Sequence, residues 1–288
     1  MKLGVLIGTH YHAGDEAALR RQTNAALSIG ALQNAQRVNL QFADGPIIER
    51  EGFSTVSRLH NDSRKASHLR GRPTPILNEM CSLLAELALA QDLPYFMLIN
   101  SDEMVMQPAV DVVLGEGLDG YIFSRMDFNP ETGEDIGMLY GGQGCWAFRT
   151  EWWRHHGWRI RPYIMGEAYV DTILTTKMLC HGRARLFNRS GECVRHEAHP
   201  RRWPSSPFLN YTRYMASLDS LYLAIWHEYI DGLEKLRNAN APAATELALQ
   251  EKVFQYHPST RARLLQFGRA VKAYFRFQAQ TFVSNWRQ

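Results

Sequence analysis

An aspartate that follows directly on a buried strand is the residue in this sequence whose position most clearly suggests chemistry. Residues 95–99 (YFMLI) form a continuous apolar run, which is typical of a strand covered on both faces of a sheet. Asn100, Ser101 and Asp102 follow it. Ligands of open α/β sheets bind beyond the carboxyl ends of the strands, and hard divalent cations often bridge a carboxylate to substrate phosphates. Asp102 is therefore a candidate metal ligand, although the same three residues also suit an ordinary turn.

Two further carboxylates, Glu167 and Asp171, are candidates for acid–base chemistry. They lie four residues apart in residues 167–180, which read as a helix that starts after Gly166 and is closed by Gly182. We therefore expect both carboxylates on the same side of one helix. Acidic residues in a first helical turn are also favoured by the helix dipole without any catalytic role, so this alternative stays open.

Two pairs of histidines are candidates for metal binding, and one of them, His196 and His199, could contact a diphosphate instead. His196 and His199 precede a change in the character of the chain near Pro204, where we expect irregular structure, and two imidazoles at this spacing can reach one site. They suit an exposed loop equally well. His10 and His12 form an HxH pattern found in barrel-type metal-dependent hydrolases. No set of strand-end histidines and aspartates at barrel spacing follows this pattern.

The elements that must position these residues alternate between strands and helices, which predicts parallel βαβ units. The expected strands are residues 3–7, 38–42, 95–99, 120–124, 145–148 and 184–187. The expected helices are residues 15–34 with Asp15 as cap, a helix from Thr74 and Pro75 onward, and residues 167–180. Residues 46–72 read as an irregular, basic loop.

The chain changes character after Pro204. Three helical segments are expected near residues 207–238, 243–256 and 259–286. We therefore divide the chain into a catalytic α/β domain, residues 1–204, and a helical C-terminal extension, residues 205–288. The last helix interleaves basic and aromatic residues. This pattern suits peripheral contact with an anionic membrane, and it suits packing on the core or on a second copy in a homo-oligomer.

Composition narrows the class of protein. A net charge of +3 and a pI near 8.7 are too mild to indicate nucleic acid as the main partner. The four cysteines form no CxxC pair, which favours a reducing compartment. The first apolar run is too short for a signal peptide, and no stretch approaches the roughly 20 apolar residues of a membrane helix. We expect a cytoplasmic protein, with a peripheral position at the inner face of the membrane as the alternative.

The order of the motifs resembles that of GT-A glycosyltransferases over about residues 1–204. The segments that carry the resemblance are residues 42–45 (FADG), 71–72 (GR), Asn78, 96–102 (FMLINSD), 140–148 (YGGQGCWAF), 165–171 (MGEAYVD) and 194–199 (VRHEAH), followed by Trp203. Each motif is weak, but their order is fairly specific. Two departures stand out. Asn100 replaces the first aspartate of the Asp-x-Asp motif, and the downstream acidic motif is spread over Glu167 and Asp171.

The resemblance implies a GT-A-like α/β fold, with a mostly parallel sheet flanked by helices. It also implies transfer of a sugar from a UDP- or GDP-linked donor to a hydroxyl of a glycan or glycoconjugate, with Mn²⁺ or Mg²⁺ as cofactor. The implied metal ligands are Asp102, His196 and His199. The implied catalytic carboxylates are Asp171 as base and Glu167 beside it. The implied nucleotide-sugar contacts are Thr9, Asp44, Arg72, Asn78, Asn100 and Ser101. The implied acceptor-side residues are Gly142, Gly144 and Trp146.

Two other classes of function remain open. A nucleotidyltransferase on a related nucleotide-binding sheet would release pyrophosphate instead of a nucleoside diphosphate. A non-catalytic saccharide-binding module would bind glycan without metal and turn nothing over. The second alternative depends on four tryptophans, namely Trp146, Trp152, Trp153 and Trp158.

Overall fold

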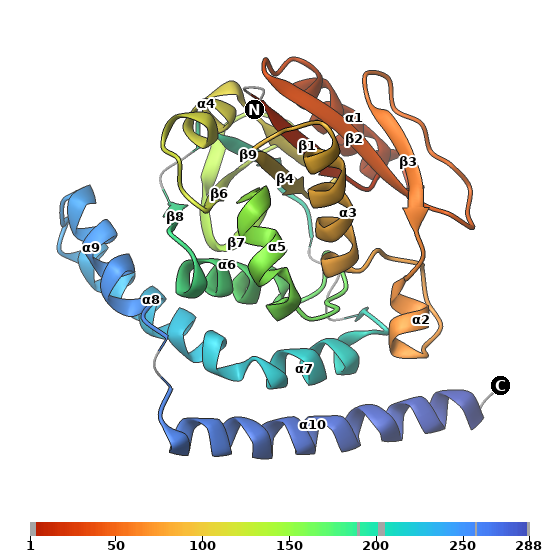
Figure 1. The fold of residues 1–288 in the computed structure, drawn as a ribbon, viewed down its shortest axis with the longest axis vertical. Helices are drawn as coiled ribbons and strands as arrows, with labels where there is room; N and C mark the ends of the chain where they lie inside the picture. Colours follow the sequence, from red (N-terminus) through yellow and green to blue (C-terminus); the bar gives the residue numbers. More distant parts are fainter. Residues whose placement is uncertain (1–3, 189–190, 201–204, 257, 287–288) are drawn as a thin grey trace.

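One mixed β-sheet organises the molecule (Figure 1). The structure is a computed structural model that describes residues 4–188, 191–200, 205–256 and 258–286. The strands in these residues are β1 (Val5–Thr9), β2 (Ala35–Phe42), β3 (Ser54–Leu59), β4 (Tyr95–Ile99), β5 (Glu103–Val105), β6 (Gly120–Phe128), β7 (Asp135–Arg149), β8 (Ala184–Phe187) and β9 (Val194–Glu197). Their order is β3-β2-β1-β4-β7-β6-β9-β5, with β8 also paired to β6.

The first half of the sheet is parallel, as the βαβ pattern predicts. Strands β1 to β4 pair in parallel, whereas β7 runs antiparallel to both β4 and β6. Strand β9 runs parallel to β6 and antiparallel to β5. The predicted class, a mostly parallel α/β sheet flanked by helices, is confirmed. The described strands form an open sheet edged by β3 and β5, so they do not form the closed barrel of the HxH alternative.

Helices cover both faces of the sheet because side chains alternate along its central strands. The helices of this part are α1 (Glu16–Gly30), α2 (Ser63–Ser67), α3 (Leu77–Ala90), α4 (Gln107–Gly115), α5 (Thr150–His156) and α6 (Val170–His181), with a 3₁₀ turn, η1 (Gly157–Arg159), after α5. Leu6, Phe96 and Leu98 join the core beneath α3, α5 and α6. Ile7 and Met97 join a second core beneath α1 and α4.

The basic segment 46–72, expected to be irregular, contains β3 and α2. Strand β3 lies at the edge of the sheet and is mostly half-buried, so its sequence lacks the apolar signal of a central strand. The expected start of α3 at Thr74 and Pro75 is also wrong, since the helix begins at Leu77 after Ile76. Residues 75 and 76 are extended instead, because Pro75 forms a bridge with Asp62 and Ile76 forms one with Ile164. The elements β5, α4, α5 and β9 were not predicted.

The C-terminal part is helical, as expected. Its helices are α7 (Leu209–Leu218), α8 (Ser220–Asn238), α9 (Ala243–Val253) and α10 (Thr260–Trp286). The expected segment 207–238 is two helices separated at Asp219, whose carboxylate accepts hydrogen bonds from Tyr163 and from Lys177 of α6, each at 2.5 Å. This buried network holds α7 and α8 against the sheet domain. Pro204, the expected boundary, lies outside the described residues, so the division at that point stays a prediction. Among the described residues, none of the helices combines the length and apolar character needed to span a bilayer.

Candidate active site

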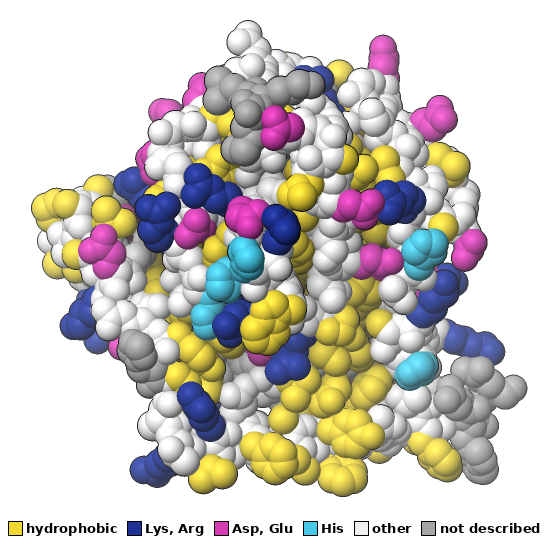
Figure 2. Space-filling model, in the orientation of Figure 1, with side chains coloured by type: hydrophobic (Ala, Val, Ile, Leu, Met, Phe, Trp, Pro, Cys, Tyr) yellow, Lys and Arg dark blue, Asp and Glu magenta, His cyan; other side chains and the backbone are white. Residues whose placement is uncertain are grey.

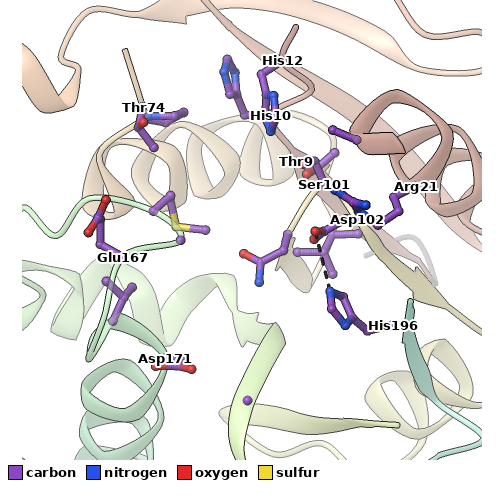
Figure 3. Close-up of a pocket in the computed structure, with 18 of the residues that line it drawn as sticks. Thr9, His10, His12, Arg21, Thr74, Ser101, Asp102, Glu167, Asp171 and His196 are labelled. Atoms are coloured by element: carbon purple, nitrogen blue, oxygen red, sulfur yellow. Dashed lines mark ion pairs between the residues drawn. The ribbon is translucent and has the colours of Figure 1, made fainter. Parts of the chain in front are cut away.

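The carboxyl ends of β1 and β4 border a cavity of about 500 Å³ (Figure 3). Its walls come from the segment after β1, from α1, from the turn after β4, from the segment that leads into α6, and from residues 205–208. Polar side chains that line it include Thr9, His10, His12, Arg21, Arg72, Asn100, Ser101, Asp102, Arg125, Asp127, Glu167, Asp171, His196 and His199. The cavity therefore lies where ligands of open α/β sheets bind.

A carboxylate and two imidazoles lie together on one side of this cavity. The Oδ2 atom of Asp102 lies 3.2 Å from Nε2 of His199 and 3.7 Å from Nε2 of His196. The two Nε2 atoms are 3.2 Å apart, and one potential ligand atom from each residue falls within 4.8 Å of the others. The structure thus brings together all three residues expected to bind metal.

Charge and hydrogen bonding orient the groups of this cluster. The Nδ1 atom of His196 lies 2.9 Å from Oδ1 of Asp127, so its Nε2 faces Asp102. Burial raises the pKa of the Asp102 carboxyl, but its hydrogen bonds with His196 and His199 outweigh burial and hold the pKa well below its usual range. Burial lowers the pKa of His196, whereas the carboxylates of Asp102 and Asp127 raise it to about 9. The carboxylate of Asp102 is consequently ionised.

Strand pairing explains why Asp102 meets a histidine nearly a hundred residues away in the sequence. The turn after β4 is held by the amide of Asn100, which donates to the carbonyl of Gly144 at 2.9 Å. Strand β5 then starts at once and pairs with β9, with Glu103 opposite His196. The expectation of irregular structure at His196 is therefore wrong, because this residue lies on β9. His199 follows the end of that strand.

Glu103, the residue after Asp102, is a fully buried carboxylate that does not line the cavity. Its Oε1 pairs with Arg125 at 3.2 Å, and burial raises its pKa although Arg125 opposes this shift. Gly144 packs directly on it, since a Cβ at this position would lie 1.7 Å from Oε1. Gly144, expected on the acceptor side, does not line the cavity, and its observed contact is with this buried ion pair.

Replacing Gly144 with Ala is expected to lower the free energy of unfolding. The added methyl group would force the Glu103 carboxylate or β7 to move, and overpacking of this kind costs about 1–3 kcal/mol. Denaturant titration would measure the change. The matched control is Gly30→Ala at the end of α1, where a Cβ meets nothing within 4 Å and Ala is the better helix former. Equal stability of the two variants would contradict this packing account.

The two candidate catalytic carboxylates both reach the cavity, but from different backbone settings (Figure 3). Helix α6 begins at Val170, so Glu167 lies in the preceding turn, and the expectation that Glu167 and Asp171 share a helical face is wrong. The turn contains two residues in left-handed conformation, Gly166 (φ 71°) and Tyr169 (φ 72°). These left-handed residues turn the chain after Met165, so α6 begins at Val170 and not at Glu167.

Their electrostatic settings differ as well. Burial raises the pKa of Asp171 to about 6, although the amide of Thr172 donates to its Oδ1 at 2.9 Å. Burial also raises the pKa of Glu167, whose Oε1 accepts a hydrogen bond from Ser206 at 2.6 Å. The Oε2 atom of Glu167 is buried without a hydrogen-bond partner among the described residues.

Four of the residues expected to contact a nucleotide sugar line the cavity, namely Thr9, Arg72, Asn100 and Ser101. The hydroxyl of Thr9 is buried and has no partner among the described residues. Two others lie elsewhere. Asp44 is exposed in the turn after β2, and Asn78 borders a separate hollow beside Trp153 and Trp158.

On the expected acceptor side, Gly142 and Trp146 line the cavity. Trp146 is nearly fully buried, and its indole N–H donates to Thr175 Oγ1 at 3.1 Å. Trp152 and Trp153 are buried too, whereas Trp158 is 74% exposed. The four tryptophans that suggested a saccharide-binding module therefore do not form one exposed platform.

Sequence reasoning missed several cavity residues. Arg21 of α1 lies beside Ser101 and Asp102, and its Nε is buried without a hydrogen-bond partner among the described residues (Figure 3). Its position on the face of α1 that carries Ala18, Ala25 and Ile29 is the signal that could have revealed it. Arg125 and Asp127 lie two residues apart on β6, so both point to the same face of the sheet. Two charged residues at this spacing in a strand are the signal that could have revealed them.

The chain resembles known proteins in structure and not in sequence. No protein-family model and no curated protein matches the chain. Among solved structures, residues 1–349 of S. aureus TarS are similar with a TM-score of 0.48 and 9% sequence identity, over 75% of this chain and 65% of that one. A mycobacterial protein is similar with a TM-score of 0.36 and 15% identity, over 83% of this chain and 76% of that one. The chain thus spans about two thirds of the length of the TarS structure.

Proposed function

We propose that this protein is a metal-dependent glycosyltransferase that moves a sugar from a nucleotide-diphosphate donor to a hydroxyl of a glycan or glycoconjugate. The observation that carries the proposal is the grouping of Asp102, His196 and His199 in a cavity at the carboxyl end of β4. Besides this group, the same cavity contains three arginines and three further carboxylates, which are the kinds of side chain that an anionic donor and a hydroxyl acceptor require.

The donor set fits a divalent cation held by Asp102, His196 and His199. Their potential ligand atoms lie within 4.8 Å of one another, and Asp127 orients the imidazole of His196 through its other nitrogen. Two imidazoles with one carboxylate favour Mn²⁺ over Mg²⁺, which prefers oxygen ligands. A bound cation would neutralise negative charge on the departing diphosphate.

Side chains of the chain itself supply the remaining functions. The guanidinium groups of Arg21 and Arg72 are suited to bind the diphosphate, since arginine matches phosphate oxygens in a bidentate manner. Asp171 would accept the proton of the acceptor hydroxyl, because a carboxyl with a pKa near 6 is a better base at neutral pH than an ordinary one. Glu167 would accept a hydrogen bond from a sugar hydroxyl through Oε2. We leave Asp44 and Asn78 out of this site because neither lines the cavity.

Thermal-shift measurements with UDP- and GDP-linked sugars, with and without Mn²⁺, test the proposal. A ligand that binds only the folded protein adds about 2.7 kcal/mol of stability at roughly 100 times its Kd. We expect at least one nucleotide sugar to raise Tm only when Mn²⁺ is present. Stabilisation by nucleoside triphosphates with release of pyrophosphate would indicate the nucleotidyltransferase instead. No stabilisation by any nucleotide ligand would overturn the proposal.

The double variant His196→Ala/His199→Ala is expected to lose the Mn²⁺-dependent part of this shift. Removing two of three proposed ligands leaves Asp102 alone, and even loss of an orienting partner typically lowers metal affinity by about 10–100-fold. His227→Ala, at an exposed position on α8, is the matched control. An unchanged Mn²⁺ dependence in the double variant would refute the assignment of these histidines.

A further inference from the structure

The last helix, α10, presents two different apolar stripes. One faces the protein, where α10 packs across α7 and touches α8, with Ala270 and Phe277 buried in the contact (Figure 1). The other stripe is exposed. Its residues are Leu264 (67% exposed), Phe267 (69%), Val271 (38%), Phe275 (67%) and Phe282 (71%).

The helical repeat places the two stripes on different sides of α10. The exposed residues follow one another at steps of three, four, four and seven, which are close to whole turns of a helix. At about 100° per residue, the centre of this outer stripe lies roughly 120° around the helix from Ala270 and Phe277. Figure 2 shows hydrophobic side chains along the lower edge of the molecule, where α10 lies in Figure 1. The outer stripe is therefore not covered by any described part of the chain.

Basic residues flank the outer stripe. Arg261, Arg269, Lys272 and Arg276 fall within about 80° of one another beside it, and residues 260–286 contain no aspartate or glutamate. A helix with an exposed apolar stripe and a basic flank fits the interface of an anionic bilayer, where apolar groups insert among lipid headgroups and cations meet lipid phosphates. A second copy packed antiparallel against this stripe would instead set one basic flank against another.

We propose that the outer face of α10 binds the surface of an anionic lipid bilayer, with the helix lying parallel to the membrane plane. The proposal rests on α10 alone and does not require the proposed function. It also concerns the cavity, because α10 supports part of the cavity wall. The Gln280 side chain donates to the carbonyl of Pro207 at 3.4 Å, and Phe277 packs with Phe208 in one cluster. Pro207 and Phe208 both line the cavity.

Co-sedimentation of the full chain with lipid vesicles tests this proposal. We expect binding to vesicles of phosphatidylcholine mixed with phosphatidylglycerol, little binding to phosphatidylcholine alone, and weaker binding as salt is raised.

The variant Arg269→Gln/Lys272→Gln/Arg276→Gln should bind anionic vesicles roughly 100-fold more weakly, since each basic residue near such a surface contributes about a fivefold gain in affinity. The variant Phe267→Gln/Phe275→Gln should lose binding while circular dichroism stays unchanged, because both residues are exposed.

The control variant is Leu27→Gln on α1, an apolar residue that is 69% exposed on another part of the molecule. It should bind vesicles as the wild type does. Equal binding of all variants, or equal binding to neutral and anionic vesicles, would overturn the proposal. Sedimentation velocity supplies a further outcome. A dimer that dissociates in the Phe267→Gln/Phe275→Gln variant would assign the outer stripe to a second copy and overturn membrane binding.

Discussion

Asp102→Asn should lower kcat/KM for sugar transfer by on the order of 10³-fold and remove the Mn²⁺-dependent part of nucleotide binding. The substitution keeps the size of the side chain but removes the charge of the carboxylate shared by His196 and His199. Charge stabilisation by a bound cation is worth several kcal/mol, and about 1.4 kcal/mol corresponds to a tenfold change in rate. The change is nearly isosteric, but the depressed pKa of Asp102 means that its carboxylate stabilises the folded state, so Tm without ligand should also fall.

Isothermal titration with a nucleoside diphosphate, with and without Mn²⁺, separates metal binding from nucleotide binding. Asp231→Asn on α8 is the matched control, since this aspartate is exposed and does not line the cavity. It should leave both titrations unchanged. If the Asp102→Asn protein retained the Mn²⁺-dependent affinity of the wild type, Asp102 would not be a metal ligand.

Asp171→Asn should lower kcat by about 10²–10⁴-fold, the usual contribution of a general base, while the affinity for the donor stays near normal. A base acts only in its ionised form, and burial raises the pKa of Asp171 to about 6, with the nearby Arg125 opposing this rise and Glu103 adding to it. The kcat of the wild type should therefore fall as pH drops through about 6 and approach about a tenfold loss per unit below it. The residual activity of the variant should lack this acidic limb.

Glu167→Gln is the comparison that distinguishes the two carboxylates. If Glu167 only binds a sugar hydroxyl, its loss should raise KM more than it lowers kcat. A larger loss of kcat in Glu167→Gln than in Asp171→Asn would exchange the two roles. If both variants keep most of their kcat and the product retains the anomeric configuration of the donor, neither residue is the base of an inverting reaction.

The sequence alone was sufficient for the central part of the fold and for one side of the site. The apolar run 95–99 predicts β4 because a strand buried on both faces is usually a continuous apolar run, and it forms that strand. Asp15 caps α1 as expected, since its side chain accepts from the amide of Ala18. Asp102 reaches the cavity because it directly follows β4, so local pattern and strand direction together determine its position.

Contacts between distant segments determine the positions of several site residues that local sequence patterns do not predict. His196 joins Asp102 because β5 pairs with β9, and a three-residue strand carries too little periodicity to be read from sequence. Glu167 leaves the helical face of Asp171 because Gly166 and Tyr169 adopt left-handed conformations before α6 begins.

Bridges made by Pro75 and Ile76 likewise delay α3, although Pro75 alone would suit its first turn. Asn78, in the first turn of α3, borders a separate hollow and not the cavity. Local propensity favours a helix or a strand at each segment, but differences in propensity are only a fraction of a kcal/mol per residue. Pairing and packing across the sheet contribute more, and they therefore decide where elements begin and which side chains meet.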